Sequence, residues 1–191
     1  MEVKNMMKLR KLVVIIIGSL VLVGCGQGAT PNKDTTIKDD NMTENKEDST
    51  SSEESTPSFL LKDIKGNMHN LSDYKGKKVY IKMWASWCSI CLSGLDEIDK
   101  LSNSNKNYEV ITIAAPNYKN EKNEGDFTSW FKSLEYKNIQ VLLDSDGTFM
   151  KEIGVRGYPT SLFIDEKGNL KKIQPGHLNN EQIDEVMNSL K

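Results

Sequence analysis

The chain has 191 residues, three cysteines and a formal net charge of −2, and 37% of its residues are hydrophobic. A basic N-terminal segment and a longer acidic segment together account for this charge, which leaves residues 58–191 neutral. A neutral domain lacks the basic surface that nucleic-acid binding requires, so we expect no nucleic-acid partner.

The chain opens with a basic stretch and a short apolar run. The apolar residues 12–23 are too few for a comfortable membrane span, and they are flanked like a secretory signal. The run ends in Gly24-Cys25, which resembles a bacterial lipobox. We therefore expect a lipoprotein signal peptide over residues 1–24 and lipidation of Cys25. The alternative is an uncleaved N-terminal anchor with an incidental cysteine. Either arrangement tethers the rest of the chain outside the cytoplasmic membrane.

Residues 25–57 are polar and acidic. Ile37 and Met42 are the only sizeable apolar side chains after the lipobox in this segment. It cannot bury enough apolar surface to offset the entropy of ordering, so we expect a disordered tether that self-repulsion extends. Residues 58–191 then form one domain of ordinary size.

Predicted strands and helices alternate along this domain. Apolar, β-rich runs predict strands near residues 59–61, 68–71, 77–84, 110–115, 141–143, 161–164 and 170–173. Helices are predicted over residues 91–101, 127–134, 148–153 and 183–190. Asn179, followed three residues later by Gln182, forms a capping box before the last helix. The alternation predicts an α/β sheet that helices cover on both faces.

Two cysteines, Cys88 and Cys91, stand two residues apart where a predicted strand gives way to a helix. A dithiol at this spacing can open and close a disulfide without moving the backbone far. The position of Cys88 at a helix N-terminus favours its thiolate, the form that reacts. The pair therefore predicts a redox site.

The residues around this dithiol carry a resemblance to a known family. Residues 84–91 are similar to the active-site segment of the thioredoxin-like TlpA/ResA family, and residues 154–160 resemble its loop with a cis-proline. The two segments occur in the right order, and the resemblance extends over essentially all of residues 58–191. It implies an α/β, thioredoxin-like fold with an N-terminal β-hairpin extension and a central mixed sheet between helices.

The resemblance also implies roles for individual residues. Cys88 would attack a client disulfide, and Cys91 would resolve the mixed disulfide, with no cofactor beyond the Cys88–Cys91 disulfide. Pro159 would be in cis, so that the backbone of Tyr158 can pair with an extended client peptide. Trp87 would shield the sulfur and contribute to the docking surface.

Three positions depart from related proteins. Ser89 and Ile90 replace the glycine and proline of thioredoxin, which leaves the Ile90 amide free to face Cys88 and predicts a less reducing couple. Lys82 stands where thioredoxin has a buried acid; it either reaches solvent or lowers the thiol pKa values. Gly94 stands where many cytochrome-maturation members have glutamate, which weakens the interpretation as a cytochrome-maturation protein.

Other uses of the cysteines fit less well. A structural disulfide is an alternative for a secreted chain. A zinc site needs four ligands, and only His69 and His177 remain, each far away in the sequence. Copper delivery by such a scaffold usually takes a wider cysteine spacing, so His177 is a weak candidate ligand. We expect no metal and expect both histidines to be ordinary surface residues.

The similarity is strongest to extracellular thioredoxin lipoproteins of Gram-positive bacteria that reduce methionine sulfoxide reductase. It implies a lipid-anchored reductase that receives electrons from a CcdA-type membrane protein and passes them through Cys88 and Cys91 to protein disulfides. Reduction of apocytochrome c, as in ResA-like proteins, is the alternative. A non-catalytic binding lipoprotein is a minor alternative.

Overall fold

The computed structural model describes residues 56–191. The predicted signal peptide, the predicted lipidation of Cys25 and all but the last two residues of the predicted tether lie outside the described residues. Thr56 is buried, and its amide donates to the carbonyl oxygen of Gly168 over 3.3 Å. Within residues 56–191, no helix has the length and apolar character that crossing a membrane requires.

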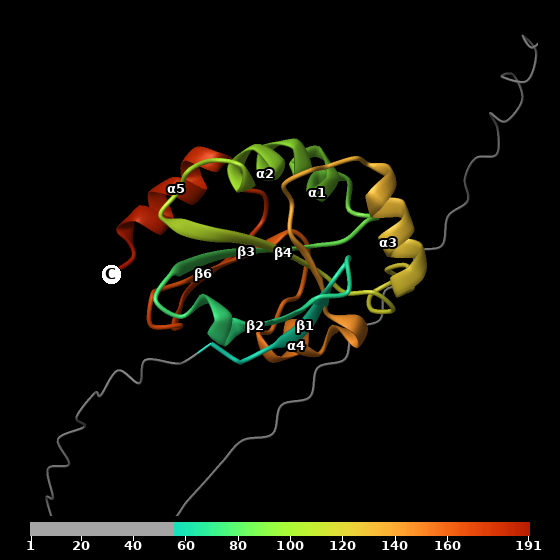
Figure 1. Ribbon diagram of the computed structural model, residues 1–191, viewed down its shortest axis with the longest axis horizontal. Helices are drawn as coiled ribbons and strands as arrows, with labels where there is room; N and C mark the ends of the chain where they lie inside the picture. Colours follow the sequence, from blue (N-terminus) through green and yellow to red (C-terminus); the bar gives the residue numbers. More distant parts are fainter. Residues whose placement is uncertain (1–55) are drawn as a thin grey trace, which may run out of the picture. The chain divides into compact units, whose positions relative to one another are not determined.

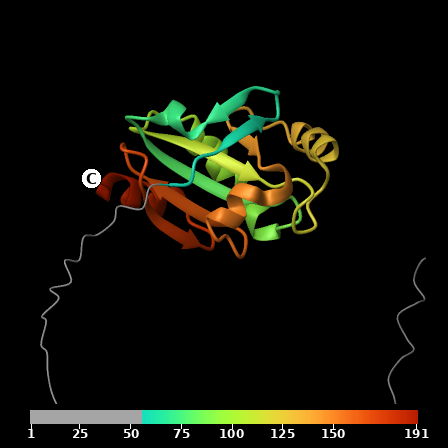
Figure 2. The same ribbon diagram turned by 90° about the horizontal axis from the view of Figure 1, so that it is seen from below.

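A seven-stranded mixed sheet forms the centre of the domain, with the order β2-β1-β5-β4-β3-β6-β7 (Figures 1 and 2). The strands are β1 (Leu60–Asp63), β2 (Met68–Asn70), β3 (Lys78–Trp84), β4 (Tyr108–Ala114), β5 (Val141–Leu143), β6 (Thr160–Ile164) and β7 (Leu170–Pro175). β3 pairs in parallel with β4, and β4 pairs in parallel with β5, whereas the other neighbours are antiparallel. The β1–β2 hairpin extends the sheet beyond β5, which confirms the predicted N-terminal extension.

Helices cover both faces of this sheet. They are α1 (Ser89–Ser93), α2 (Leu95–Ser102), α3 (Glu124–Ser133), α4 (Thr148–Glu152) and α5 (Asn180–Ser189), with short 3-10 turns η1 (Leu71–Tyr74) and η2 (Ser145–Gly147). The helices α1, α2, α3 and α5 pack on one face, and α4 and η1 pack on the other (Figure 1). The predicted thioredoxin-like architecture is therefore confirmed.

Strand β3 contributes to both apolar layers because its side chains alternate between the faces of the sheet. Tyr80 and Trp84 join the layer under α1, α2, α3 and α5, and Ile81 and Met83 join the opposite layer. Lys82 shares the face of Tyr80 and Trp84. The last residue of the strand, Trp84, therefore lies in the same apolar layer as Cys88 and Cys91.

The single helix predicted over residues 91–101 is instead two helices that meet at Gly94. Gly94 is the C-cap of α1 and the N-cap of α2, and its amide donates to the carbonyl of Cys91 over 3.3 Å. Glycine weakens the continuity of a helix, and the periodicity of the flanking apolar residues conceals the break. The capping box at the start of α5 formed as predicted, with Asn179 and Gln182 bonded reciprocally.

Candidate active site

The two cysteines lie just beyond the end of β3, where the chain turns into α1. They form a disulfide, with Cα atoms 5.2 Å apart. Cys91 is fully buried inside the helical layer, whereas a small part of Cys88 reaches the surface. The attacking and resolving positions implied by the resemblance therefore have different access to solvent.

A main-chain amide faces the sulfur of Cys88. Cys88 is the N-cap of α1, and its Sγ accepts a hydrogen bond from the amide of Cys91 over 3.2 Å. The sequence predicted that the amide of Ile90 would face this sulfur, so the donor differs from the prediction. A donor at this position stabilises negative charge on Cys88 and so favours its thiolate.

An exposed apolar surface lies beside Cys88. Trp87 and Ile90 are 52% and 50% exposed. The ring of Trp87 meets that of Tyr158 edge to face, with centroids 5.7 Å apart. We call Trp87, Ile90 and Tyr158 the docking surface. Large apolar side chains exposed together mark a place where another molecule binds.

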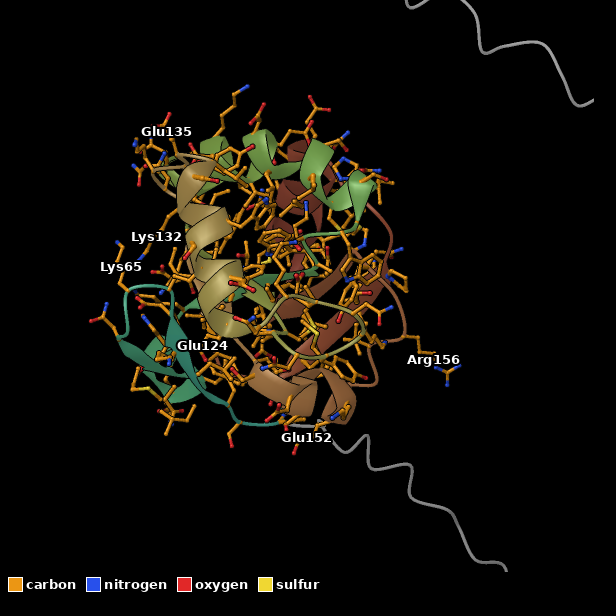
Figure 3. All side chains as sticks on the ribbon, turned by 90° about the vertical axis from the view of Figure 1, so that its right-hand side faces the viewer. Lys65, Glu124, Lys132, Glu135, Glu152 and Arg156 are labelled. Carbon is orange, nitrogen blue, oxygen red and sulfur yellow. A yellow bond between two sulfur atoms is a disulfide. The ribbon has the colours of Figure 1, made fainter. Side chains whose placement is uncertain are left out.

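The cis-proline loop borders this surface. The peptide bond between Tyr158 and Pro159 is cis, as the resemblance implied. β6 begins at Thr160, so the backbone of Tyr158 lies outside the sheet. The hydroxyl of Tyr158 donates to Sδ of Met150 over 3.1 Å, which fixes the ring against α4. Within this loop, the side chain of Arg156 points away from the domain (Figure 3).

The loop over residues 116–123 contacts both the segment before Cys88 and the cis-proline loop. The sequence did not predict these contacts. The buried carboxylate of Glu121 accepts hydrogen bonds from both the amide and the hydroxyl of Ser86, each 2.5 Å long. Lys122 Nζ donates to the same hydroxyl over 2.8 Å. Lys119 Nζ reaches the carbonyl oxygens of Val155 and Arg156 at 3.0 and 3.1 Å. The loop thereby ties the segment before Cys88 to the cis-proline loop.

Three residues of this loop have a left-handed backbone conformation, and the asparagines among them are the sequence signal that could have predicted a specific loop. Asn117, Lys119 and Asn120 all have positive φ, between 47° and 64°. Asparagine tolerates this region better than most residues, so Asn117 and Asn120 indicate a tight, specific loop. The partners of the loop lie far away in the sequence and could not be read from it.

Lys82 is buried, which removes the alternative that it reaches solvent. The residue is 2% exposed and lies under the junction of α1 and α2. Burial lowers the pKa of its amine to about 8, and the negative charge of Glu97 opposes part of this effect. Lys82 lies on the face of β3 opposite Ile81 and Met83, and helices cover that face.

Neither histidine is an ordinary surface residue, contrary to expectation. His69 lies in the β1–β2 hairpin, 3.3 Å from a carboxylate oxygen of Asp63, and His177 lies 3.4 Å from a carboxylate oxygen of Glu97. Both rings are partly covered because the sheet edge and α2 pack against them. Across residues 56–191, His, Cys, Asp and Glu side chains do not gather in groups of three that suit a metal ion.

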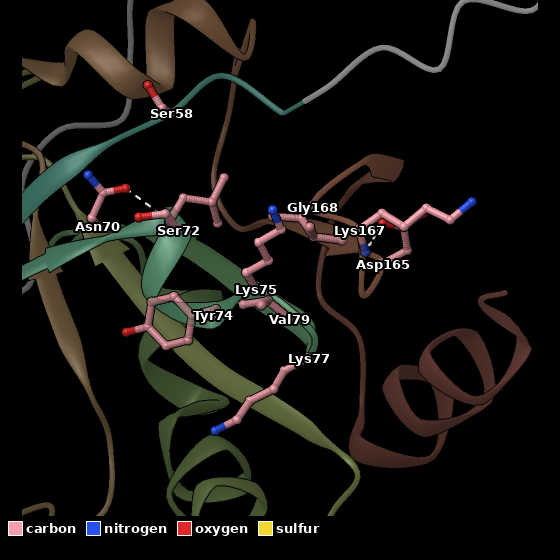
Figure 4. Close-up of a pocket in the computed structure, with 12 residues that line it drawn as sticks. Ser58, Asn70, Ser72, Tyr74, Lys75, Lys77, Val79, Asp165, Lys167 and Gly168 are labelled. Atoms are coloured by element: carbon pink, nitrogen blue, oxygen red, sulfur yellow. Dashed lines mark hydrogen bonds between the residues drawn. The ribbon is translucent and has the colours of Figure 1, made fainter.

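A pocket of about 230 Å³ lies at the opposite end of β3 from the dithiol (Figure 4). It is lined by residues including Ser58, Tyr74, Lys75, Val79 and Asp165. Neither cysteine and no residue of the docking surface contributes to it. This pocket is therefore not part of the redox site, where Cys88 reaches the surface beside exposed apolar side chains.

The fold and the dithiol agree with comparison against known proteins. Residues 51–190 match the family model described as Redoxin. The chain belongs to the Redoxin family. Within it, the relatives are of the thioredoxin-like TlpA/ResA type, and the chain is a thiol-disulfide oxidoreductase. This removes the alternative of a non-catalytic binding lipoprotein.

Three relatives of this Redoxin protein are informative. An uncharacterized protein of Haemophilus influenzae is 58% identical over 124 residues, which cover 64% of this chain and 80% of that protein. The thiol-disulfide oxidoreductase ResA of Bacillus thuringiensis is 27% identical over 186 residues, covering 96% and 99% of the two chains. The crystal structure of the pneumococcal exposed lipoprotein thioredoxin Etrx1 from Streptococcus pneumoniae has a TM-score of 0.68 and 44% identity, covering 70% of this chain and all of that one. The relatives thus come from both Gram-negative and Gram-positive bacteria.

Proposed function

We propose that this Redoxin protein is a lipid-anchored reductase on the extracytoplasmic face of the cell membrane. It receives electrons from a CcdA-type membrane protein and passes them to extracellular protein disulfides, with peptide methionine sulfoxide reductase as the main client. The observation that carries the proposal is the Cys88–Cys91 disulfide beside the exposed docking surface. The relative described as an exposed lipoprotein thioredoxin supports the location.

Reduction of a client disulfide proceeds in two steps, attack by Cys88 and resolution by Cys91. In the reduced protein, the thiolate of Cys88 attacks one sulfur of the client disulfide, and the other client sulfur leaves with the electron pair and takes up a proton. Cys91 then attacks the sulfur of Cys88, the mixed disulfide breaks, and the second client thiol is released. Two electrons have moved to the client, and the protein holds the Cys88–Cys91 disulfide.

The arrangement of the site favours a protein client over a small disulfide. The docking surface offers apolar contacts, and the backbone of Tyr158, which precedes β6, is not paired in the sheet. An extended peptide can form main-chain hydrogen bonds with such unpaired backbone groups. The loop over residues 116–123 holds these parts together through Glu121 and Lys119.

Trapping identifies the client. In the full-length chain, Cys91→Ser leaves Cys88 able to attack but removes the resolving thiol, so mixed disulfides should accumulate in cells. We expect methionine sulfoxide reductase in the trapped complexes, released by dithiothreitol and absent when Cys88 is also changed to serine. Apocytochrome c as the trapped protein would replace our proposed client with the alternative one. Absence of any complex that depends on Cys88 would contradict the exchange mechanism.

A further inference from the structure

The loop over residues 116–123 is hydrogen-bonded within itself, and the exchange steps above do not use it. The amide of Asn117 donates to the carbonyl oxygen of Lys122, and the amide of Glu121 donates to the carbonyl oxygen of Tyr118, each over 3.0 Å. These bonds join the beginning of the loop to its end. A contact made by one side chain of the loop therefore constrains the contacts made by the others.

One contact of this loop fixes the turn that leads to Cys88. The buried carboxylate of Glu121 accepts hydrogen bonds from the amide and hydroxyl of Ser86, and from the amide of Lys122 over 2.7 Å. Ser86 is itself 6% exposed and precedes Cys88 by two residues. Hydrogen bonds to a charged acceptor are stronger than those between neutral groups, especially away from water. Glu121 therefore holds the backbone just before the attacking sulfur.

A second contact supports the cis-proline loop. The amine of Lys119, which is half-buried, donates to the carbonyl oxygens of Val155 and Arg156. Among residues 56–191, no other donor reaches these two oxygens. Residues 155–158 precede β6 and are not paired in the sheet. Lys119 is therefore a restraint on the backbone before Tyr158 that the sheet does not supply.

The same amine lies in a row of cations and rings that ends at the docking surface. Lys119 Nζ is 5.4 Å from the ring centroid of Tyr118 and 5.7 Å from that of Tyr158. Lys151 Nζ is 4.7 Å from the centroid of Tyr118, and Tyr158 in turn meets the ring of Trp87. A cation within about 6 Å of a ring centroid is attracted to the ring. Lys119 thus restrains the ring of Tyr158 as well as the backbone before it.

We propose that Lys119 and Glu121 are positioning residues for an extended peptide client. Together they hold the backbone of Tyr158 at a fixed separation from Cys88. A peptide whose disulfide lies at Cys88 can then also form main-chain hydrogen bonds with Tyr158. Because the two parts are held before the client arrives, less entropy is lost on binding. This inference rests on the proposed exchange with protein disulfides.

A small disulfide and a peptide disulfide make different demands on this arrangement. A small aromatic disulfide needs only access to the sulfur of Cys88 and forms no main-chain pairing with Tyr158. Loss of the Lys119 amine should therefore weaken the binding of a peptide and leave the reaction with the small disulfide intact. A general disturbance of the fold would instead slow both reactions.

Single-turnover kinetics separates binding from chemistry. All variants are full-length chains carrying Cys25→Ser, which leaves Cys88 and Cys91 as the only cysteines. The reduced protein is mixed with increasing concentrations of a linear peptide dimer joined by one disulfide, or with dithiobis(nitrobenzoate). Lys119→Met should raise the peptide concentration that gives half the maximal rate at least about fivefold, with the maximal rate within about twofold of wild type. Its rate with dithiobis(nitrobenzoate) should also stay within about twofold of wild type.

Lys119→Arg is the matched variant, because a guanidinium can also donate to two carbonyl oxygens and lie over a ring. Residue 119 has a φ of 47°, so arginine and methionine meet the same backbone demand and differ in the cation. Lys119→Arg should stay within about twofold of wild type with both disulfides. Lys132→Met, at an exposed position of α3, should change neither reaction.

The contribution of Glu121 is tested by combining variants. Glutamine keeps one acceptor oxygen for Ser86 but not the charge, so Glu121→Gln should also raise the half-maximal peptide concentration. Its effect should not add to that of Lys119→Met, because either change releases the same loop. A half-maximal concentration in Lys119→Met within about twofold of wild type, or an equal loss with dithiobis(nitrobenzoate), would overturn the proposal. A wild-type protein that reduces neither disulfide would instead contradict the proposed function.

Discussion

Lys82 is an ionisable side chain whose burial carries a cost to the fold. An amine buried under α1 and α2 loses its hydration, and its pKa falls from 10.5 to about 8 for that reason, with Glu97 compensating in part. Such a penalty is typical of residues that are retained for function and not for stability. At Lys82, burial therefore changes the pKa of the amine from the value that the residue type alone would give.

We expect Lys82→Met to stabilise the oxidised protein by about 1–3 kcal/mol at neutral pH, because methionine fills the same space without a charge. Below a pH of about 8 the lysine is charged in both states, so the penalty is complete there. Between about 8 and 10.5 the unfolded chain binds more protons, so wild-type stability should rise with pH. Urea denaturation at several pH values measures both effects. A destabilised variant would show that the amine makes favourable contacts that the structure lacks.

At the scale of elements, the β1–β2 hairpin depends on the carboxylate of Asp63. The amides of Lys65 and Asn67 donate to it over 2.8 Å each, and the side chains of Asn67 and His69 approach it at 3.0 and 3.3 Å. Burial alone would raise the pKa of Asp63, but these hydrogen bonds outweigh it and lower the pKa to about 2. The hairpin in turn pairs with β5 and completes one edge of the sheet.

Asp63→Asn should therefore destabilise the protein by about 2 kcal/mol at neutral pH, because an amide cannot accept all of these bonds. The folded-state pKa of Asp63 is depressed, so its contribution is present above a pH of about 4 and is lost as the pH falls toward about 2. The difference between wild type and variant should vanish over this window. Thermal denaturation as a function of pH tests this, with the exposed Asp146→Asn as the control. A difference that persists at a pH of about 2 would contradict it.

Two other elements differ from what periodicity predicted. The helix after Cys91 breaks at Gly94, where side chains of β3 and of the β7–α5 loop leave no room for a larger residue. The loop over residues 116–123 is a polar insert by composition, yet it holds Ser86 and the cis-proline loop together. In both cases, residues that are distant in the sequence determine the local conformation.

At the scale of the whole molecule, the sheet separates two apolar layers, and the dithiol belongs to the larger one. Phe127 of α3 is 0% exposed and packs against Trp84 and Phe131, with ring centroids 5.6 and 6.4 Å away. Trp84 is the last residue of β3 before the active-site turn. The packing of α3 therefore supports the segment that carries Cys88.

Phe127→Ala should cost about 3–5 kcal/mol of unfolding free energy, since it removes a fully buried ring from this layer. Leu60→Ala, at a position that is 64% exposed, should change stability by less than about 0.5 kcal/mol. Urea denaturation of the oxidised proteins measures both values. A small loss in Phe127→Ala would mean that neighbouring rings close the cavity.

The sequence by itself determined the α/β class, the order of the strands and helices, the redox dithiol and the cis-proline loop. The first three depend on short-range spacing: alternation along a strand, apolar periodicity along a helix, and two cysteines at a strand end. The cis-proline loop was predicted from the resemblance of residues 154–160 to the TlpA/ResA family. The location predicted from Cys25 and the client of the enzyme stay predictions. Only the tertiary structure decided that Lys82 is buried, that His177 and Glu97 join it, and that Glu121 holds Ser86. These contacts join segments that are distant in the sequence, and their chemistry depends on how much water the packed layers exclude.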